Sequence, residues 1–123
     1  MQILLWDDFK DQIENHDDFI DRMYELIINK LMNDCVNKKQ IVIDNFNYSY
    51  LDFCLFSVAS QCTQLLDKKL IIIVNSFRPF YIFKMKKYNH NCVIARKFKL
   101  DTNSLLIDSE MYHNQKSHVL PIT

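Results

Sequence analysis

The clearest pattern along the chain is an apolar stripe at helical spacing. Its members recur in pairs every four residues, at Phe19, Ile20, Met23, Tyr24, Ile27, Ile28, Leu31, Met32 and Cys35. Polar and charged side chains fill the intervening positions, so the pattern predicts an amphipathic helix over 18–35. A second stripe, formed by Leu51, Cys54, Leu55, Val58, Cys62, Leu65 and Leu66, predicts a helix over 50–66.

Short, continuous apolar runs predict buried strands at 41–45 and 70–75. A strand, a helix and a second strand within such a short stretch form a βαβ unit. We therefore expect these two strands to be parallel and adjacent. Weaker patterns predict strands at 2–6 and 91–96, and a helix at 78–88 that begins at Pro79.

The remaining segments complete a small domain. Asp7 or Asp8 can cap a short helix that runs to about residue 15. Residues 97–100 and 104–108 flank Thr102 and Asn103 as the arms of a predicted hairpin. Residues 112–123 show no clear pattern and are expected to form a flexible tail. The elements predict one α/β domain over 1–123, a small, mostly parallel sheet flanked by amphipathic helices.

Composition narrows the function. The 123 residues include no glycine, where average usage of about 7% would give roughly nine. Phosphate-binding loops, dinucleotide fingerprints and the nucleophile elbow of hydrolases use glycine where the backbone approaches a ligand or takes a positive φ. The sequence excludes these sites. Asn, Lys, Ile, Phe and Tyr are plentiful, as in proteins of AT-rich genomes, which is compatible with a phage or viral protein that binds a host factor.

No apolar run approaches the roughly 18 residues of a membrane span. The short apolar start, residues 1–6, is followed at once by Asp7 and Asp8, which is unlike a signal peptide. We therefore expect a cytoplasmic protein without a membrane partner. In that compartment the four cysteines, Cys35, Cys54, Cys62 and Cys92, are expected to be reduced thiols.

The net charge of zero conceals a polarity along the chain. Residues 1–34 hold nine acidic and three basic side chains, a net charge of −6, whereas residues 68–99 hold nine basic and no acidic ones. Aromatic residues interleave with these bases at Phe77, Phe80, Tyr81, Phe83, Tyr88 and Phe98. Three interpretations stay open: core aromatics with a solvated charged face, a protein partner or a second copy, and single-stranded nucleic acid.

The sequence shows little sign of a catalytic or metal-binding site. His90 and Cys92 are close in sequence, but no second pair at metal-ligand spacing is near. Asp44 ends a predicted parallel strand, where α/β proteins place functional groups, and it is equally suited to a turn. Scattered cysteines and histidines form no recognisable constellation. We expect no enzymatic activity, no cofactor and no metal.

Residues 40–88 resemble the central part of the STAS domain, the fold of bacterial anti-sigma-factor antagonists. The strand IVID ends in Asp44, NFNYSYLDFCLFSVASQCTQLL matches the loop and helix, and KLIIIVNSFRP matches the next strand and helix start. Asp52 matches the loop aspartate of the family. Phe53 stands where the family carries its phosphorylatable Ser or Thr, and the following glycine is missing. The resemblance implies a binding scaffold without the phosphorylation switch.

The sequence therefore predicts a non-enzymatic protein-interaction or regulatory module. The alternative is a nucleic-acid-binding protein that uses the basic and aromatic segment 68–99. The residues predicted to contact the partner are Arg78, Lys84, Lys86, Lys87, Tyr88, Asp44 and Asp52.

Overall fold

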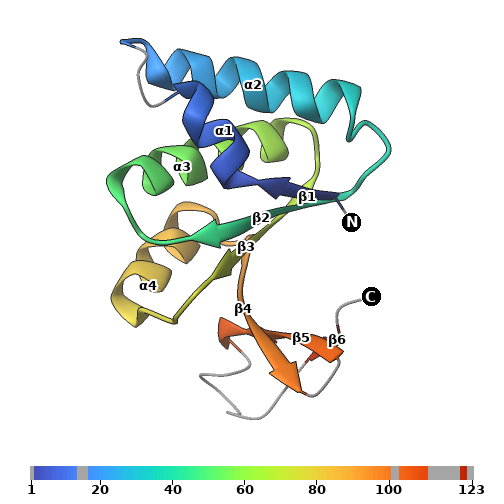
Figure 1. Cartoon of the computed structure of the whole chain (residues 1–123), viewed down its shortest axis with the longest axis vertical. Helices are drawn as coiled ribbons and strands as arrows, with labels where there is room; N and C mark the ends of the chain where they lie inside the picture. The colour runs from blue at the N-terminus through green and yellow to red at the C-terminus, as the bar shows by residue number, and fades with distance from the viewer. Residues whose placement is uncertain (1, 14–16, 101–102, 111–119, 122–123) are drawn as a thin grey trace.

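The computed structural model describes residues 2–13, 17–100, 103–110 and 120–121, with side chains over 10–13, 17–97 and 107–110. These residues form an α/β fold (Figure 1). Helices and strands alternate along the first hundred residues, followed by a strand-rich end. The elements in order are β1 (Gln2–Leu5), α1 (Trp6–Ile13), α2 (Phe19–Asn33), β2 (Gln40–Phe46), α3 (Tyr50–Leu65), β3 (Lys69–Val74), α4 (Pro79–Tyr88), β4 (Val93–Leu100), β5 (Asn103–Asp108) and β6 (Leu120–Pro121).

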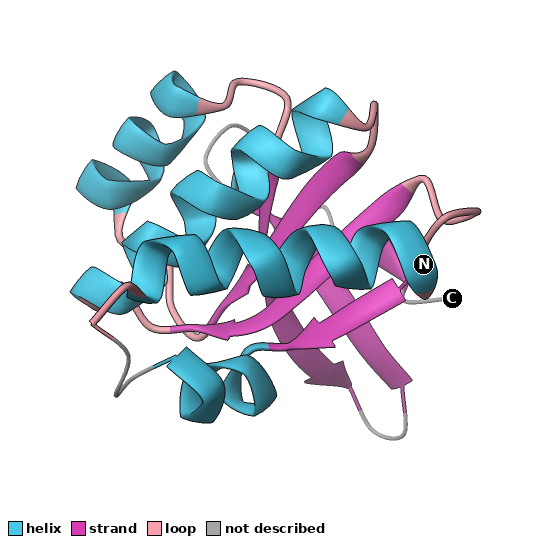
Figure 2. Ribbon diagram, turned by 90° about the horizontal axis from the view of Figure 1, so that it is seen from above, coloured by secondary structure: helices cyan, strands magenta, loops and turns pink. Residues whose placement is uncertain are grey.

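The strands form one six-stranded sheet in the order of the sequence, β1-β2-β3-β4-β5-β6. Neighbours from β1 to β4 are parallel, whereas β5 and β6 are added antiparallel. Crossovers between parallel strands are almost always right-handed, so strands added in one direction place their connecting helices on one face. Figure 2 shows these helices stacked in front of the strands.

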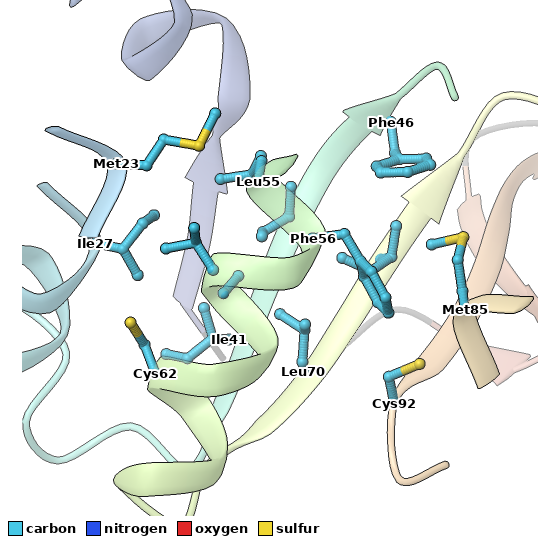
Figure 3. Close-up of a cluster of buried hydrophobic side chains, with 14 of the residues drawn as sticks. Met23, Ile27, Ile41, Phe46, Leu55, Phe56, Cys62, Leu70, Met85 and Cys92 are labelled. Carbon is cyan, nitrogen blue, oxygen red and sulfur yellow. The ribbon is translucent and has the colours of Figure 1, made fainter. Parts of the chain in front are cut away.

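Alternating side chains of the central strands divide the core between the two faces of the sheet. Ile72 of β3, fully buried, lies on the face that α1–α4 cover, together with Ile41 and Ile43 of β2. Ile71 and Ile73 point to the opposite face with Val42, and the buried cluster there contains only strand residues among the described side chains. The helix-side cluster is the larger one, and Figure 3 shows it between α3, the strands and Met85 of α4.

The two long helices differ in how they are buried. α2 buries one stripe, Met23, Ile27 and Leu31, and exposes its acidic side, as its amphipathic pattern predicts. α3 lies between α2 and α4 and is buried on most of its circumference (Figure 1). Its amino end is fixed by a capping box, in which the Ser49 hydroxyl accepts from the Asp52 amide and the Asp52 carboxylate accepts from the Ser49 amide.

Positive φ angles occur in this glycine-free chain and fall on other residues. Among the described residues they are Asn45 (62°), Tyr48 (60°) and Asp67 (54°). Asp67 follows the end of α3, where its amide bonds to the Gln64 carbonyl and the Lys68 amide bonds to the Thr63 carbonyl. This pair of bonds is a Schellman motif, whose left-handed residue is most often glycine. The turns therefore form without glycine, and residues that carry a Cβ adopt the left-handed conformation at a higher energy than glycine would.

Most predicted elements are confirmed. β2 and β3 are adjacent and parallel, and α2, α3 and α4 occupy the predicted ranges within a few residues. Residues 91–96 and 97–100 were predicted as separate strands, which is wrong, since β4 runs unbroken from Val93 to Leu100. Residues 93–96 of β4 pair with β3 and residues 95–100 pair with β5. A tail over 112–123 is wrong at Leu120–Pro121, which pair with β5, and 112–119 lie outside the described residues.

Replacing Asp67 with glycine should stabilise the protein, because glycine carries no Cβ to strain a left-handed residue. We expect Asp67→Gly to raise the free energy of unfolding by about 1 kcal/mol. Asp67→Ala is the control, because it removes the carboxylate and keeps the Cβ. Urea unfolding followed by circular dichroism measures both variants, and equal stability of the two would contradict the explanation.

Candidate functional site

Helix α4 has fewer buried residues than α2 or α3 and carries most of the predicted contact residues. It begins with Pro79 in its first turn, where a missing amide hydrogen costs nothing. Met85 is the only residue of the helix that is fully buried. Beyond its carboxyl end, the buried Asn89 donates a hydrogen bond from its amide to the Ser60 hydroxyl of α3 at 3.2 Å. Met85 and Asn89 thus contribute to holding α4 against α3, and the outer side of the helix stays exposed.

The outer side of α4 combines aromatic rings with ammonium groups. Phe80, Phe83, Lys84 and Lys87 fall at positions i, i+3, i+4 and i+7, which lie on one face of a helix. Phe80 is 65% exposed and Phe83 66%. The Lys84 ammonium lies 4.6 Å from the centre of the Phe80 ring, and that of Lys87 lies 6.0 Å from the Phe83 ring. Among the described side chains, no carboxylate pairs with either lysine.

A groove of about 340 Å³ runs between α3 and α4, beside these residues. Its surface is mainly apolar and is formed by Phe53, Phe56, Ser57, Tyr81, Lys84, Met85 and Tyr88. The size falls in the range of sites that accept a small molecule or a side chain of a partner. We call the groove and the exposed residues Phe80, Phe83, Lys84, Lys87 and Tyr88 the α4 surface.

Hydrogen bonds fix the rim of the groove. The Tyr88 hydroxyl is 2.8 Å from the Ser57 hydroxyl and accepts from the Gln61 amide at 3.0 Å. The oxygen of the same Gln61 amide accepts from the Tyr24 hydroxyl of α2. Three helices are therefore linked by polar contacts across the outside of α3, and the Tyr88 ring is held as one wall of the groove.

Arg78 lies directly before α4 and places a further cation near it. Its guanidinium lies over two aromatic rings, 5.4 Å from the centre of Tyr48 and 4.6 Å from that of Tyr81. Planar guanidinium groups bind aromatic faces and carboxylates well. Arg78 lies over aromatic faces and remains exposed to solvent. Arg78 thus extends the positive charge of the α4 surface toward the carboxyl edge of the sheet.

Three of the predicted contact residues lie away from the α4 surface. The Lys86 ammonium pairs with Glu110 at 3.2 Å and donates to the Cys92 carbonyl, which ties α4 to the end of β5. Asp44 accepts from Lys97 at 2.7 Å and lies at the carboxyl edge of the sheet. Asp52 is only 2% exposed and caps α3. Arg78, Lys84, Lys87 and Tyr88 remain as exposed groups on or beside α4.

The carboxyl edge of the sheet holds a second polar group, around the strained loop after β2. The Asn75 amide donates to the side-chain oxygens of Asn45 and Asn47. The Tyr48 hydroxyl donates to the Ser76 carbonyl at 2.6 Å, and burial raises the pKa of this phenol. The Ser76 carbonyl and the Arg78 amide, both after β3, thus bond to the Tyr48 hydroxyl and help to hold Tyr48 at its positive φ, which a bulky residue rarely adopts. The hydrogen bonds of Asn75 and Ser76 therefore connect the loop after β2 to the end of β3.

The cysteines behave as part of the core. Cys35, Cys62 and Cys92 are buried and Cys54 is half-buried, and all four are free thiols. Burial raises the pKa of Cys92 to about 11 and also raises the pKa of Cys35 and of Cys62. A thiol with a raised pKa is a poor nucleophile. Within the described part of the chain, no three His, Cys, Asp or Glu side chains gather as metal ligands, while His16, His113 and His118 lie outside it.

Comparison with known proteins gives no relative from which a role can be taken. Searches of family models, curated proteins and solved structures found no significant match. Among the helices of the described residues, none has the length and apolar character to cross a membrane. The site is therefore interpreted from its own chemistry.

Sequence reasoning missed the α3 side of the groove. Phe53 and Phe56 were not singled out, because helical periodicity assigned the buried stripe of this helix to its neighbours. Phe80 and Phe83 were noted as aromatics, but nothing in the sequence distinguished them from core residues. Their exposure follows from the shallow packing of α4, which only the tertiary arrangement sets.

The buried carboxylate of Asp52 should matter more for stability than the serine with which it shares the capping box. Asp52→Ala leaves the Asn47 and Ser49 amides without their acceptor, and we expect a cost of about 2 kcal/mol. Ser49→Ala removes a single cap and should cost about 1 kcal/mol. Urea unfolding of both variants tests this order, and a larger loss for Ser49→Ala would contradict it.

One of the four cysteine thiols should react readily in the folded protein, and the other three should be protected from the reagent. At pH 8, Cys54 is expected to react first with an aromatic disulfide reagent, because Cys35, Cys62 and Cys92 are buried with raised pKa values. All four should react after denaturation. Cys54→Ser should abolish the fast phase, and a fast phase that survives in this variant would show that another thiol is accessible.

Proposed function

We propose that this protein is a non-enzymatic interaction module that binds a protein partner through the α4 surface. The observation that carries the proposal is the pair of exposed rings, Phe80 and Phe83, beside an apolar groove with a cationic rim. Large aromatic side chains are enriched in protein–protein interfaces, and charges around the rim of an interface steer and orient the partner. Phe53 and Phe56 would receive an apolar anchor of the partner, and Lys84 and Lys87 would pair with its carboxylates.

The distribution of the basic residues favours a protein over nucleic acid. A single-stranded nucleic acid needs a continuous cationic path with free aromatic faces. In segment 68–99, Lys86 and Lys97 pair with carboxylates, and the Lys68 ammonium donates to the carbonyls of Cys35, Val36 and Lys38. The cations that remain around α4 lie on the faces of aromatic rings, so the same rings are partly covered.

The STAS resemblance agrees with a binding role. Over 40–88 the elements follow in the order β2, α3, β3 and α4, which is the order that the resemblance implies, but Asp52 lies in the first turn of α3 and not in the loop before it. Under this hypothesis the protein acts as a regulator by occupying a partner, without the phosphorylation switch, since Phe53 replaces the regulatory hydroxyl. Composition adds the further hypothesis that the partner is a host factor bound by a phage or viral protein.

The proposal predicts that reversing two charges on α4 weakens partner binding and leaves the stability of the fold nearly unchanged. Lys84→Glu with Lys87→Glu should weaken partner binding at least about tenfold, because both exposed ammonium groups become repulsive toward an acidic partner. Lys38→Glu with Lys39→Glu is the matched control, with the same change of net charge at exposed positions before β2. Thermal unfolding should be nearly unchanged in both.

Cross-linking in extracts of the cells that make the protein, followed by mass spectrometry, should map partner peptides to Lys84 or Lys87. Binding of the purified partner is then compared among the wild type and the two double variants. An equal loss in both variants, or cross-links confined to other surfaces, would contradict the proposal. Tight, strongly salt-dependent binding of an oligonucleotide without any protein partner would favour the nucleic-acid hypothesis instead.

A further inference from the structure

The start of α2 forms an acidic surface with an apolar residue at its centre. Asp17, Asp18 and Asp21 are exposed, and Ile20 among them is 36% exposed. Asp18 stands at the amino cap of α2, but its side chain makes no capping hydrogen bond. Among the described side chains, no cation pairs with Asp17, Asp18 or Asp21. We call these four residues the α2 surface.

The α2 surface is opposite in charge to the α4 surface, and each combines its charges with apolar side chains. Asp17 precedes α2 and Asp21 lies in its first turn, so the two carboxylates flank Ile20 in the sequence, while Lys84 and Lys87 lie about one helical turn apart beside the groove. Both surfaces belong to the same molecule, yet they cannot meet within it, because α3 lies between α2 and α4 (Figures 1 and 2). Two copies of the chain can bring them together.

We propose that a second copy of this chain occupies the α4 surface with the start of its α2. Ile20 of one copy enters the groove over Phe53 and Phe56 of the other. Asp17 and Asp21 then pair with Lys84 and Lys87. This inference rests on the α4 surface being a protein-binding site, and it names the occupant. The mode is a helix laid into an apolar groove, with charges that set its orientation.

Electrostatics permits this association and makes it sensitive to salt. The net charge of zero gives two copies no long-range repulsion, and the opposed segments attract at short range. Exposed ion pairs are screened as ionic strength rises, so the association should weaken in high salt. Because the two surfaces differ and both occur on every copy, the contact either closes around a two-fold axis or continues head to tail.

Sedimentation velocity tests the proposal with two neutral variants. The wild type should form dimers or larger species over a micromolar to millimolar concentration series, and these should dissociate in high salt. Lys84→Gln with Lys87→Gln removes one surface, and Asp17→Asn with Asp21→Asn removes the other. Each double variant alone should associate roughly tenfold more weakly than the wild type.

An equimolar mixture of the two double variants gives the decisive result. Each variant keeps one intact surface. The mixture should therefore form a 1:1 heterodimer at concentrations at which each variant alone associates only weakly. Lys38→Gln with Lys39→Gln is the control and should associate like the wild type. Ile20→Ser leaves every charge in place and should also weaken association, which keeps the test valid if an Asp variant folds poorly.

The proposal is overturned if the wild type stays monomeric throughout the series, or if the mixed variants do not associate. If copies fail to associate but a different protein still cross-links to Lys84 or Lys87, only the identity of the occupant is wrong. If copies associate without any effect of the Lys84 and Lys87 changes, the α4 surface itself is not the binding site.

Discussion

The parallel pairing of β1, β2, β3 and β4 in the order of the sequence determines on which face of the sheet the helices of the βα units lie. Because each new strand is added in the same direction, the crossovers stack α1–α4 on one face of the sheet. Ile72 and its neighbours on that face are buried under helices, and Ile71 and Ile73 point to the opposite face. The one-sided helical layer also places α2, α3 and α4 in a row, with α3 nearly surrounded and α4 at the end.

The limited burial of α4 follows from its position at the end of this row of helices. A helix at the end of a layer has one neighbouring helix, so it buries one side only, where Met85, Ile82 and the Asn89 cap contact the rest of the protein. The rest of its side chains face solvent. Exposed phenylalanines are costly in water unless a surface covers them, and the lysines stacked on Phe80 and Phe83 cover them only in part.

The absence of glycine did not remove left-handed backbone from the fold. Asn45 and Asp67 tolerate that conformation better than most residues, because their short polar side chains interact locally. Tyr48 is held in it by its hydroxyl bond to Ser76 and by ring contacts with Phe46 and Phe53. Tertiary contacts thus stabilise a turn that the local sequence disfavours.

Local pattern was sufficient to predict the elements and their class. The stripe from Phe19 to Cys35 follows the 3.6-residue period of a helix, and the runs around Ile41 and Ile72 are continuous apolar stretches of the length of a buried strand. The parallel pairing of β2 with β3 followed from the length of the βαβ connection. The polarity between residues 1–34 and 68–99 is equally a property of the sequence, because it needs only the order of charged residues.

Only the tertiary structure decided which of those charges stay available. Lys86 and Lys97 find partners in Glu110 and Asp44, which are distant in sequence and close in space. Asp52 becomes a buried cap, whereas Lys84 and Lys87 remain exposed beside a groove whose other wall comes from α3. Exposure depends on which elements become neighbours, and that arrangement minimises the free energy of the whole chain. Residue order therefore specified the helices, the strands and the charge segments, and packing selected the surface that can bind.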